Sequence, residues 1–231
     1  MQVVVLAGGL GTRLRPITKT VPKPMVDVGG HPFLEHIIRH LAAQGFRKAV
    51  VLLGYLGDQI QAHFENGTAF GLEMRYCFEP EPLGTAGAIR NALELLDEDF
   101  LVLYGDSYLP IDYRPVVRQF REIPCLGLMV VYDNRRADTG VVNNVAADVQ
   151  GWVTRYEKGT GAPGLDYVEA GVLCFRRELF KEFPAGQFIS LEKEVYQQLI
   201  HERQLRAFVT SQRFYDIGTP ERLEEFASAR K

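Results

Sequence analysis

The sequence predicts an α/β fold in which helices flank a Rossmann-like mixed sheet. Two observations lead to this prediction. In the first half of the chain, short apolar runs alternate with segments of helical periodicity, and strands separated by helices of this size form parallel sheets with right-handed crossovers. After about residue 124 the segments become mostly strand-like, so we expect the sheet to be mixed at its far edge.

The first predicted strand covers Gln2–Ala7, a β-branched run that stops at two glycines. A helix is predicted over Pro32–Ala43, because proline suits a first helical turn and apolar residues recur at helical spacing. His36 and His40 are four residues apart, opposite the apolar stripe of this helix. We expect them to be solvated rather than to bind zinc. Lys48–Leu53 is the next apolar, strand-like run.

The alternation continues to the middle of the chain. Leu56–Glu65 is predicted to be a helix, because an Asn-Gly pair follows it. Glu73–Phe78 is the next expected strand, and Thr85–Leu96 is the next helix. Phe100–Tyr104 is an apolar run of the buried-strand type, followed by glycine and aspartate.

The second half contains mainly short runs of strand character. These predicted strands are Leu126–Tyr132, Val141–Ala146, Trp152–Glu157, Val168–Phe175 and Leu205–Thr210. Ser190–His201 is predicted to be a helix with Ser190 as its N-cap, and Pro220–Ala229 is a final helix. The glycine-rich segment Gly159–Gly164 is expected to be a mobile surface loop.

Composition excludes several classes of protein. The 231 residues are 46% hydrophobic and 24% charged, which is typical of globular proteins and argues against disorder. The formal net charge of −3 gives no support for a nucleic-acid surface. No apolar run reaches the length of a membrane span, and the first residues do not resemble a signal peptide. We therefore expect neither nucleic acid nor a membrane as a partner.

The cysteines indicate the compartment. Cys77, Cys125 and Cys174 are far apart and form no CxxC pair. This pattern predicts neither a disulfide framework nor a thiolate metal site. We interpret the three residues as small apolar side chains of a cytoplasmic protein.

The strongest functional signal is the segment Leu6–Met25, which reads LAGGLGTRLRPITKTVPKPM. Glycines after a buried strand let backbone N–H groups approach a polyphosphate. Arg13 can hold phosphate oxygens with its forked donors, and Lys23 adds a compact charge. No Gly-Lys-Ser/Thr occurs, so a P-loop is excluded. Leu14 stands where a dinucleotide loop needs its third glycine, which argues against a nicotinamide-dependent oxidoreductase.

This segment resembles the signature of the sugar-1-phosphate nucleotidylyltransferases. The resemblance continues through five later motifs in the order of that family: Glu81–Gly87, Tyr104–Asp106, Tyr156–Lys158, Glu169–Gly171 and Asp216–Thr219. It implies an enzyme that converts a nucleoside triphosphate and a sugar 1-phosphate into a nucleotide sugar and pyrophosphate, with Mg²⁺ as cofactor. We expect one nucleotidyltransferase domain, in which about residues 1–109 bind the nucleotide. About residues 110–231 would bind the sugar and close the site.

The resemblance also implies the role of each site residue. Nucleotide contacts are expected from Leu6, Ala7, Gly8, Gly9, Gly11, Thr12, Glu79, Pro82, Gly84 and Thr85. Sugar contacts are expected from Gly105, Glu169, Ala170 and Gly171. Arg13, Lys23 and Lys158 are the expected catalytic cations, and Asp106 and Asp216 are the expected Mg²⁺ ligands.

Two of these assignments have independent interpretations. Asp106 follows a buried strand and so falls at the usual ligand crevice of an α/β sheet, which supports its role. Asp216 could instead be a turn aspartate, and Lys158 an ordinary solvated lysine. Gly159 stands where the family commonly has proline. This departure affects the expected rigidity of the loop more than the expected role of Lys158.

The sequence specifies the reaction more closely than it specifies which nucleotide and which sugar react. The Pro82–Gly87 and Ser190–Glu194 segments and the short chain are most similar to mannose- and heptose-1-phosphate guanylyltransferases. Transfer from UTP, dTTP or CTP stays open, as does a non-catalytic nucleotide-sugar sensor of the same fold. The sequence also leaves open whether the chain forms a homodimer.

Overall fold

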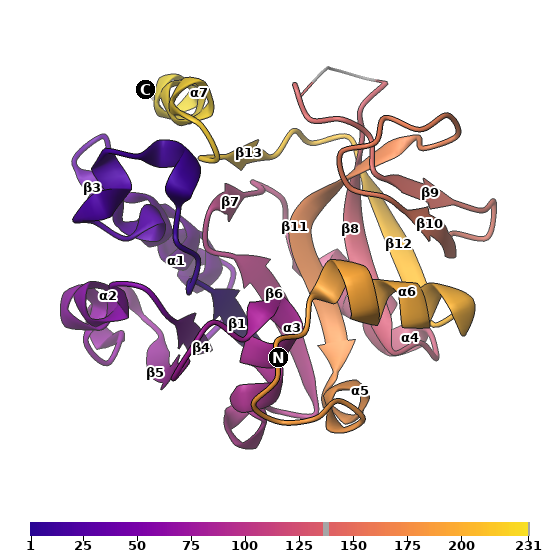
Figure 1. The fold of residues 1–231 in the computed structure, drawn as a ribbon, viewed down its shortest axis with the longest axis horizontal. Helices are drawn as coiled ribbons and strands as arrows, with labels where there is room; N and C mark the ends of the chain where they lie inside the picture. Colours follow the sequence, from indigo (N-terminus) through magenta and orange to yellow (C-terminus); the bar gives the residue numbers. More distant parts are fainter. Residues whose placement is uncertain (136–138, 231) are drawn as a thin grey trace.

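The computed structural model describes residues 1–135 and 139–230. Within these ranges, a nine-stranded sheet carries helices on both faces, which confirms the predicted α/β class (Figure 1). Its strands in chain order are β1 (Gln2–Leu6), β4 (Lys48–Leu53), β5 (Glu73–Phe78), β6 (Asp99–Tyr104), β8 (Gly127–Asp133), β9 (Val145–Ala147), β10 (Val153–Tyr156), β11 (Tyr167–Arg176) and β12 (Leu205–Thr210).

The first half of the sheet is parallel, as predicted. β4 pairs with β1 and β5, and β1 pairs with β6, all in parallel register. Val3 and Val5 join the buried cluster on one face of the sheet, whereas Val4 joins the cluster on the other. Because successive side chains of a strand point to opposite faces, the apolar run of β1 is buried on both sides.

The sheet is mixed in its second half, where antiparallel pairing extends from the interior strand β11 to β9 and β10 at the far edge. β11 pairs antiparallel with β6 on one side and with β8 on the other. β12 continues the sheet beyond β8 in parallel register, and β9 and β10 form an antiparallel pair beside the start of β11. β11 has ten residues that are mostly buried, which suits an interior strand.

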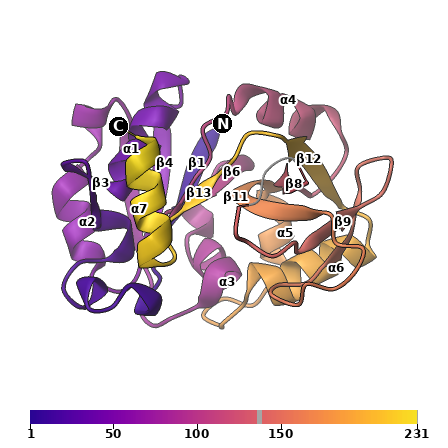
Figure 2. The same ribbon diagram turned by 90° about the horizontal axis from the view of Figure 1, so that it is seen from above.

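Helices cover the two faces of the sheet separately. One face carries α1 (Phe33–Ala43), α2 (Gly57–Phe64), α4 (Arg114–Glu122) and α7 (Pro220–Ala229). The other carries α3 (Gly84–Asn91), α5 (Arg177–Lys181) and α6 (Tyr196–His201). Figure 2 shows α4 and α6 on opposite sides of β8 and β12.

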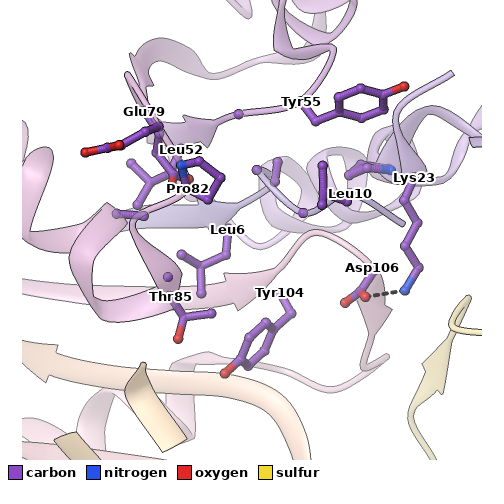
Figure 3. Close-up of a pocket in the computed structure, with 18 of the residues that line it drawn as sticks. Leu6, Leu10, Lys23, Leu52, Tyr55, Glu79, Pro82, Thr85, Tyr104 and Asp106 are labelled. Carbon is purple, nitrogen blue, oxygen red and sulfur yellow. Dashed lines mark hydrogen bonds and ion pairs between the residues drawn. The ribbon is translucent and has the colours of Figure 1, made fainter. Parts of the chain in front are cut away.

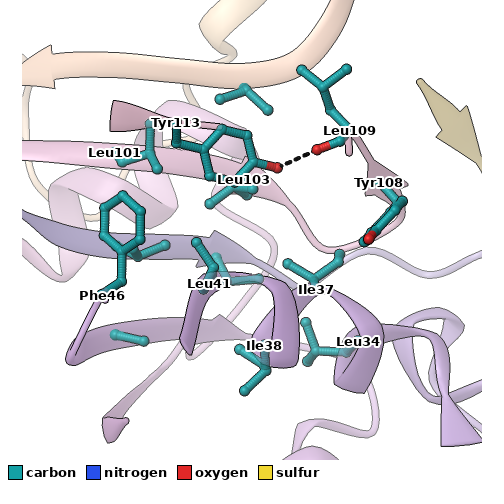
Figure 4. Close-up of a cluster of buried hydrophobic side chains, with 14 of the residues drawn as sticks. Leu34, Ile37, Ile38, Leu41, Phe46, Leu101, Leu103, Tyr108, Leu109 and Tyr113 are labelled. Carbon is teal, nitrogen blue, oxygen red and sulfur yellow. Dashed lines mark hydrogen bonds between the residues drawn. The ribbon is translucent and has the colours of Figure 1, made fainter. Parts of the chain in front are cut away.

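The first of these helices shows why the packing is specific. Four of its buried side chains follow the spacing i, i+3, i+4 and i+7, namely Leu34, Ile37, Ile38 and Leu41. Figure 4 shows these residues facing the sheet, where Leu101 and Leu103 of β6 belong to the same cluster. Fully burying one aliphatic side chain contributes about 1.5–3 kcal/mol, so this stripe anchors α1 to the sheet.

Several elements differ from the sequence prediction. α4 and α5 were not expected; in α4 only Val116 and Phe120 are buried, which leaves a narrow apolar stripe. β9 covers Val145–Ala147, so it starts four residues later than the predicted strand Val141–Ala146. The predicted helix Thr85–Leu96 is split into α3 and a 3-10 turn over Leu93–Leu95.

The predicted N-cap at Ser190 is confirmed. The Ser190 hydroxyl accepts hydrogen bonds from the backbone N–H groups of Glu192 and Lys193, at 3.1 and 3.3 Å. The chain then forms a π-helical turn over Leu191–Val195 before α6 begins.

The two histidines of α1 are not simply solvated, and this expectation was wrong. His36 Nε2 lies 3.0 Å from the Val28 carbonyl oxygen, and His40 Nε2 lies 3.0 Å from that of Ile111. Burial lowers the pKa of both rings. They pack under α7 and beside Tyr108, because those later segments cover the polar side of α1.

The structure also tests what the sequence predicted for the cysteines, for membrane-spanning segments and for the glycine-rich loop. Cys125 and Cys174 are buried and Cys77 is half-buried, and all three are free thiols, as expected for small apolar residues. Among residues 1–135 and 139–230, no helix is long and apolar enough to span a bilayer. The Gly159–Gly164 segment joins β10 to β11 and is mostly exposed.

Candidate active site

A cavity of about 510 Å³ opens at the carboxyl ends of the parallel strands (Figure 3). Leu6 of β1, Leu52 of β4 and Tyr104 of β6 form part of its wall. This is the position at which α/β sheets bind ligands. Eight of the ten expected nucleotide residues line the cavity: Leu6, Ala7, Gly8, Gly9, Glu79, Pro82, Gly84 and Thr85.

The other two expected nucleotide residues lie outside this lining. Gly11 and Thr12 begin a short 3-10 turn, and the Thr18 hydroxyl donates to the Gly11 carbonyl oxygen at 2.7 Å. The structure therefore gives these two residues a role in shaping the loop.

Gly8 sits where the loop passes closest to its neighbours. A Cβ atom at this position would lie 2.4 Å from Glu79 Oε1 and 3.2 Å from the Gly54 backbone nitrogen. No other residue type would fit without displacing the Glu79 carboxylate. The loop thus brings its backbone into direct contact with the opposite wall.

Glu79 connects that wall to the start of α3. Its Oε2 accepts a hydrogen bond of 2.8 Å from the Leu83 N–H. Burial raises the pKa of the Glu79 carboxyl, although this hydrogen bond opposes the rise. Thr85 Oγ1 accepts from the Leu191 N–H at 2.8 Å, so its hydroxyl joins α3 to the π-helical turn.

Lys23 and Asp106 form an ion pair at the other end of the cavity, as Figure 3 shows. Lys23 Nζ lies 2.5 Å from Asp106 Oδ2, and the lysine is buried. Burial alone would raise the pKa of Asp106, but the charge and hydrogen bond of Lys23 outweigh it and lower that pKa. About a third of the Asp106 side chain stays exposed.

Asp216 is brought next to Asp106 by a small separate sheet. β7 (Ser107–Tyr108) and β13 (Tyr215–Asp216) pair antiparallel, with Asp216 opposite Ser107. The Ile217 N–H donates to the Asp106 carbonyl oxygen at 3.1 Å. Two aspartates 110 positions apart in the sequence thus meet at one edge of the site.

Two arginines lie around Asp216. Arg222 Nη1 is 2.9 Å from Asp216 Oδ2, and the Gly218 N–H donates to Oδ1 at 2.7 Å. Arg13 is nearby, since a Cβ on Gly218 would lie 3.4 Å from Arg13 Nη2. Burial, the largest influence on the pKa of Asp106, would raise it, and Lys23 is the main group that lowers it. The charge of Arg13 makes a smaller contribution in the same direction as Lys23.

The donor set at this edge suits a hard divalent cation. Asp106 and Asp216 offer carboxylate oxygens, the ligands that Mg²⁺ prefers. In the described part of the chain, no cluster of three or more His, Cys, Asp or Glu residues could hold a metal by itself. Mg²⁺ commonly binds through one or two carboxylates together with substrate phosphates, so two aspartates fit a site completed by substrate.

Glu169 of β11 is held by two tyrosines. Tyr196 donates to Glu169 Oε1 and Tyr156 to Oε2, both at 2.8 Å. The Glu169 N–H donates to Asn144 Oδ1 at 2.9 Å. Burial raises the pKa of Glu169, and the two tyrosine hydroxyls act against that rise.

Glu169 is also connected to the cavity and to the aspartates. The Tyr196 hydroxyl lies 3.4 Å from that of Tyr104, which lines the cavity. The register between β11 and β8 shifts after Glu169. Within this irregular stretch Ala170 is buried, and a Cβ on Gly171 would lie 2.8 Å from Ser107 Cβ.

Gly105 and Lys158 complete the expected set. The Gly105 N–H donates to the Leu6 carbonyl oxygen at 2.9 Å, so it joins β1 to the Asp106 turn. Lys158 is mostly exposed, forms an ion pair with Glu192 and does not line the cavity. Burial raises the pKa of Glu169, and the charge of Lys158 acts in the opposite direction.

Several residues of this site were not expected from the sequence. They are Tyr55 and Phe188 in the cavity wall, Tyr196 and Asn144 at Glu169, and Glu192 and Arg222 as ion-pair partners. Glu192 falls in the Ser190–Glu194 segment that resembles the guanylyltransferases, but no role was assigned to it, and the others belong to no motif with a chemical signature. An aromatic or charged residue in an ordinary helix or loop carries no signal until its distant partner is known.

Comparison with known proteins agrees with this geometry. The family model described as "Nucleotidyl transferase" matches residues 2–231. D-glycero-alpha-D-manno-heptose 1-phosphate guanylyltransferase of Campylobacter jejuni is 34% identical over 96% of both chains. Mannose-1-phosphate guanylyltransferase of Mycobacterium tuberculosis is also 34% identical, over 96% of this chain and 62% of its own length.

A solved structure gives the same result. HddC from Yersinia pseudotuberculosis, in complex with GMP-PN, superposes with a TM-score of 0.83 at 29% identity, covering 100% of this chain and 99% of its own. The match therefore extends over the whole sheet and the cavity rather than over one motif. The chain belongs to the nucleotidyl transferase family.

Proposed function

We propose that the protein transfers a guanylyl group from GTP to the 1-phosphate of a mannose- or heptose-type sugar, forming a GDP-sugar and pyrophosphate. The observation that carries this proposal is the placement of Lys23 and Asp106 at one end of the cavity, with Asp216 beside Asp106 and with Glu169 connected to the cavity wall through Tyr196 and Tyr104. A nucleotide in the cavity and a sugar at Glu169 would direct their phosphates to this shared edge.

The nucleotide half of the reaction fits the cavity. Its volume of about 510 Å³ is within the usual range for small-molecule sites. The glycine loop offers backbone N–H groups to phosphates, and the Glu79–Thr85 wall offers polar groups to a base. Residues 1–109 supply most of this lining, which supports their assignment as the nucleotide-binding part.

The chemical step needs no protein nucleophile. An oxygen of the sugar phosphate attacks the α-phosphorus of GTP in line, the new P–O bond forms, and the bond to pyrophosphate breaks. The attacking phosphate is already anionic at neutral pH, so catalysis consists of positioning and of stabilising charge. Lys23 must turn from Asp106 toward the phosphates to do this, and Arg13 would hold the departing pyrophosphate.

Asp106 and Asp216 would hold Mg²⁺ at this edge. When bound, the cation neutralises charge on the reacting phosphates. Both carboxylates are paired with cations in the structure, Asp106 with Lys23 and Asp216 with Arg222. Moving Lys23 onto a phosphate would therefore free the Asp106 oxygen for the metal.

The sugar half of the reaction would depend on Glu169 and Lys158. A carboxylate accepts hydrogen bonds from hydroxyls in defined directions, and the two tyrosines fix those directions. Lys158 is exposed and paired with Glu192 in this structure. It would reach the sugar phosphate only after leaving that carboxylate, and it would then serve every sugar 1-phosphate alike.

The names of the similar proteins support the choice of GTP and of a mannose- or heptose-type sugar. UTP, dTTP and CTP are the alternatives within the same reaction class. We also propose a cytoplasmic location, which the three free cysteines support because thiols persist in reducing compartments.

The decisive experiment is a pyrophosphate-release screen with Mg²⁺. Four nucleoside triphosphates are each paired with several sugar 1-phosphates, and initial rates are compared. The proposal predicts the highest kcat/KM for GTP with a mannose- or heptose-type sugar. Higher kcat/KM with another nucleotide would overturn the base assignment, and no release with any pair would favour a non-catalytic sensor.

A further inference from the structure

Phe188 is an apolar side chain in an unusual place. It is 67% exposed, yet it lines the cavity wall. A large exposed aromatic ring at the rim of a pocket has no packing role that would explain it. Aromatic rings stack on flat ligands with offset or edge-to-face geometry, so the position of Phe188 suits a planar partner.

The backbone around Phe188 is firmly attached to α3. The Ile189 carbonyl oxygen accepts from the Ala86 and Gly87 N–H groups at 2.9 and 3.1 Å. The Ile189 N–H donates to the Leu83 carbonyl oxygen at 2.8 Å. These three hydrogen bonds hold the segment against the first turn of α3, although the two segments are about a hundred residues apart.

Gly84 allows this contact. Its φ of +71° is a conformation that favours glycine, and a Cβ there would lie 2.6 Å from the Ile189 carbonyl oxygen and 3.2 Å from Phe188 Cζ. The ring of Phe188 therefore rests directly against the backbone of the Gly84–Thr85 wall. Any side chain at position 84 would push the ring away.

The position within the cavity identifies the moiety that the ring would meet. Lys23 and Asp106 occupy one end and Thr85 another part of the wall, as Figure 3 shows. Phosphates are expected at the cationic Lys23 end. The base of the same nucleotide would then extend toward the Gly84–Thr85 wall, where Phe188 lies.

We propose that Phe188 packs against the base of the bound nucleotide and thereby favours purines over pyrimidines. This inference rests on the proposed function, because it takes a nucleotide as the occupant of the cavity. A purine offers a larger flat face than a pyrimidine, so stacking on Phe188 adds more to its binding. The Phe188 ring favours the larger base, and the polar groups of the wall at Glu79 and Thr85 would form hydrogen bonds with the edge of the base.

Equilibrium binding tests the proposal directly. Dissociation constants for GTP, ATP and UTP are measured by calorimetry with Mg²⁺ and without sugar phosphate, for the wild type and four variants. Phe188→Ala is expected to weaken GTP on the order of tenfold, which corresponds to about 1.4 kcal/mol of stacking. UTP should lose less, so the ratio between the two constants should shrink.

The other variants separate stacking from simple apolar contact. Phe188→Trp should keep tight GTP binding, whereas Phe188→Leu should bind nearly as weakly as the alanine variant. Phe78→Ala is the matched control, because Phe78 is 41% exposed and packs near Gly57 outside the cavity lining. This control should bind all three nucleotides as the wild type does.

The outcomes also distinguish this inference from the proposed function. If the wild type binds nucleotides and Phe188→Ala binds them equally well, the stacking role is wrong and the proposed reaction stands. An equal loss for GTP and UTP would refute the purine preference. If the wild type binds no nucleotide, the proposed function itself fails.

Discussion

Replacing Tyr196 with phenylalanine should separate sugar recognition from nucleotide recognition. The change removes a hydroxyl that donates to Glu169 Oε1 at 2.8 Å and leaves the buried ring in place. Hydrogen bonds to charged groups contribute about 1.5–3 kcal/mol. We therefore expect kcat/KM for the sugar phosphate to fall roughly 10- to 100-fold, while the KM for GTP stays unchanged.

The same substitution should alter the pH dependence. The Tyr196 hydroxyl helps to lower the pKa of Glu169 against the effect of burial, so its loss raises that pKa further. Ionised Glu169 offers only acceptors to the sugar hydroxyls, whereas protonation turns one of its oxygens into a donor, so sugar binding weakens as the pH falls through its pKa. The acid limb of the kcat/KM profile, measured between about pH 5 and 8, should therefore move to higher pH.

A matched control removes a different buried hydroxyl. Tyr113 donates to the Leu109 carbonyl oxygen at 2.8 Å in the cluster of Figure 4, on the opposite face of the sheet. Tyr113→Phe should cost stability, about 1 kcal/mol, with normal kinetics. An unshifted acid limb in Tyr196→Phe, or a shift of equal size in Tyr113→Phe, would refute the positioning role of Tyr196.

Four further predictions concern the reacting phosphates and the sugar. Asp106→Asn should reduce turnover by orders of magnitude, and near-normal turnover at saturating Mg²⁺ would contradict its metal role. Arg13→Ala should slow both synthesis and pyrophosphorolysis, and an intact reverse rate would show that Arg13 does not hold pyrophosphate. Glu169→Gln should reorder the accepted sugars, because an amide presents a donor where the carboxylate had only acceptors. Lys158→Ala should raise the KM for all sugar phosphates by similar factors, and a matrix of kcat/KM values over several sugars distinguishes these two results.

The cavity-lining residues of the glycine loop could be located from the sequence because they are close together in the chain. Leu6 to Gly9 follow directly after a buried strand, and a parallel strand ends at the ligand crevice. Asp106 was located by the same argument, from the end of β6. For these residues the local sequence pattern shows where a strand ends, and the end of a parallel strand is also where the ligand binds.

The partners of Glu169 could not be located in this way. Tyr196 lies in a helix 27 residues later, and its hydroxyl meets the carboxylate only because α6 packs against β10 and β12, beside β11. The contact of Phe188 with Gly84 likewise depends on backbone hydrogen bonds between distant segments. Residue type alone does not show which of ten tyrosines or fourteen phenylalanines does this.

The sequence by itself determined the α/β class, most strand positions, the glycine loop with its cations and the family. These features depend on periodicity and on short motifs, which neighbouring residues specify. Only the tertiary structure decided that β11 lies inside the sheet, that Asp216 meets Asp106, and that Lys158 pairs with Glu192 outside the cavity. Such contacts join segments that are far apart in the chain, and burial and pairing across the whole molecule select them rather than local propensity.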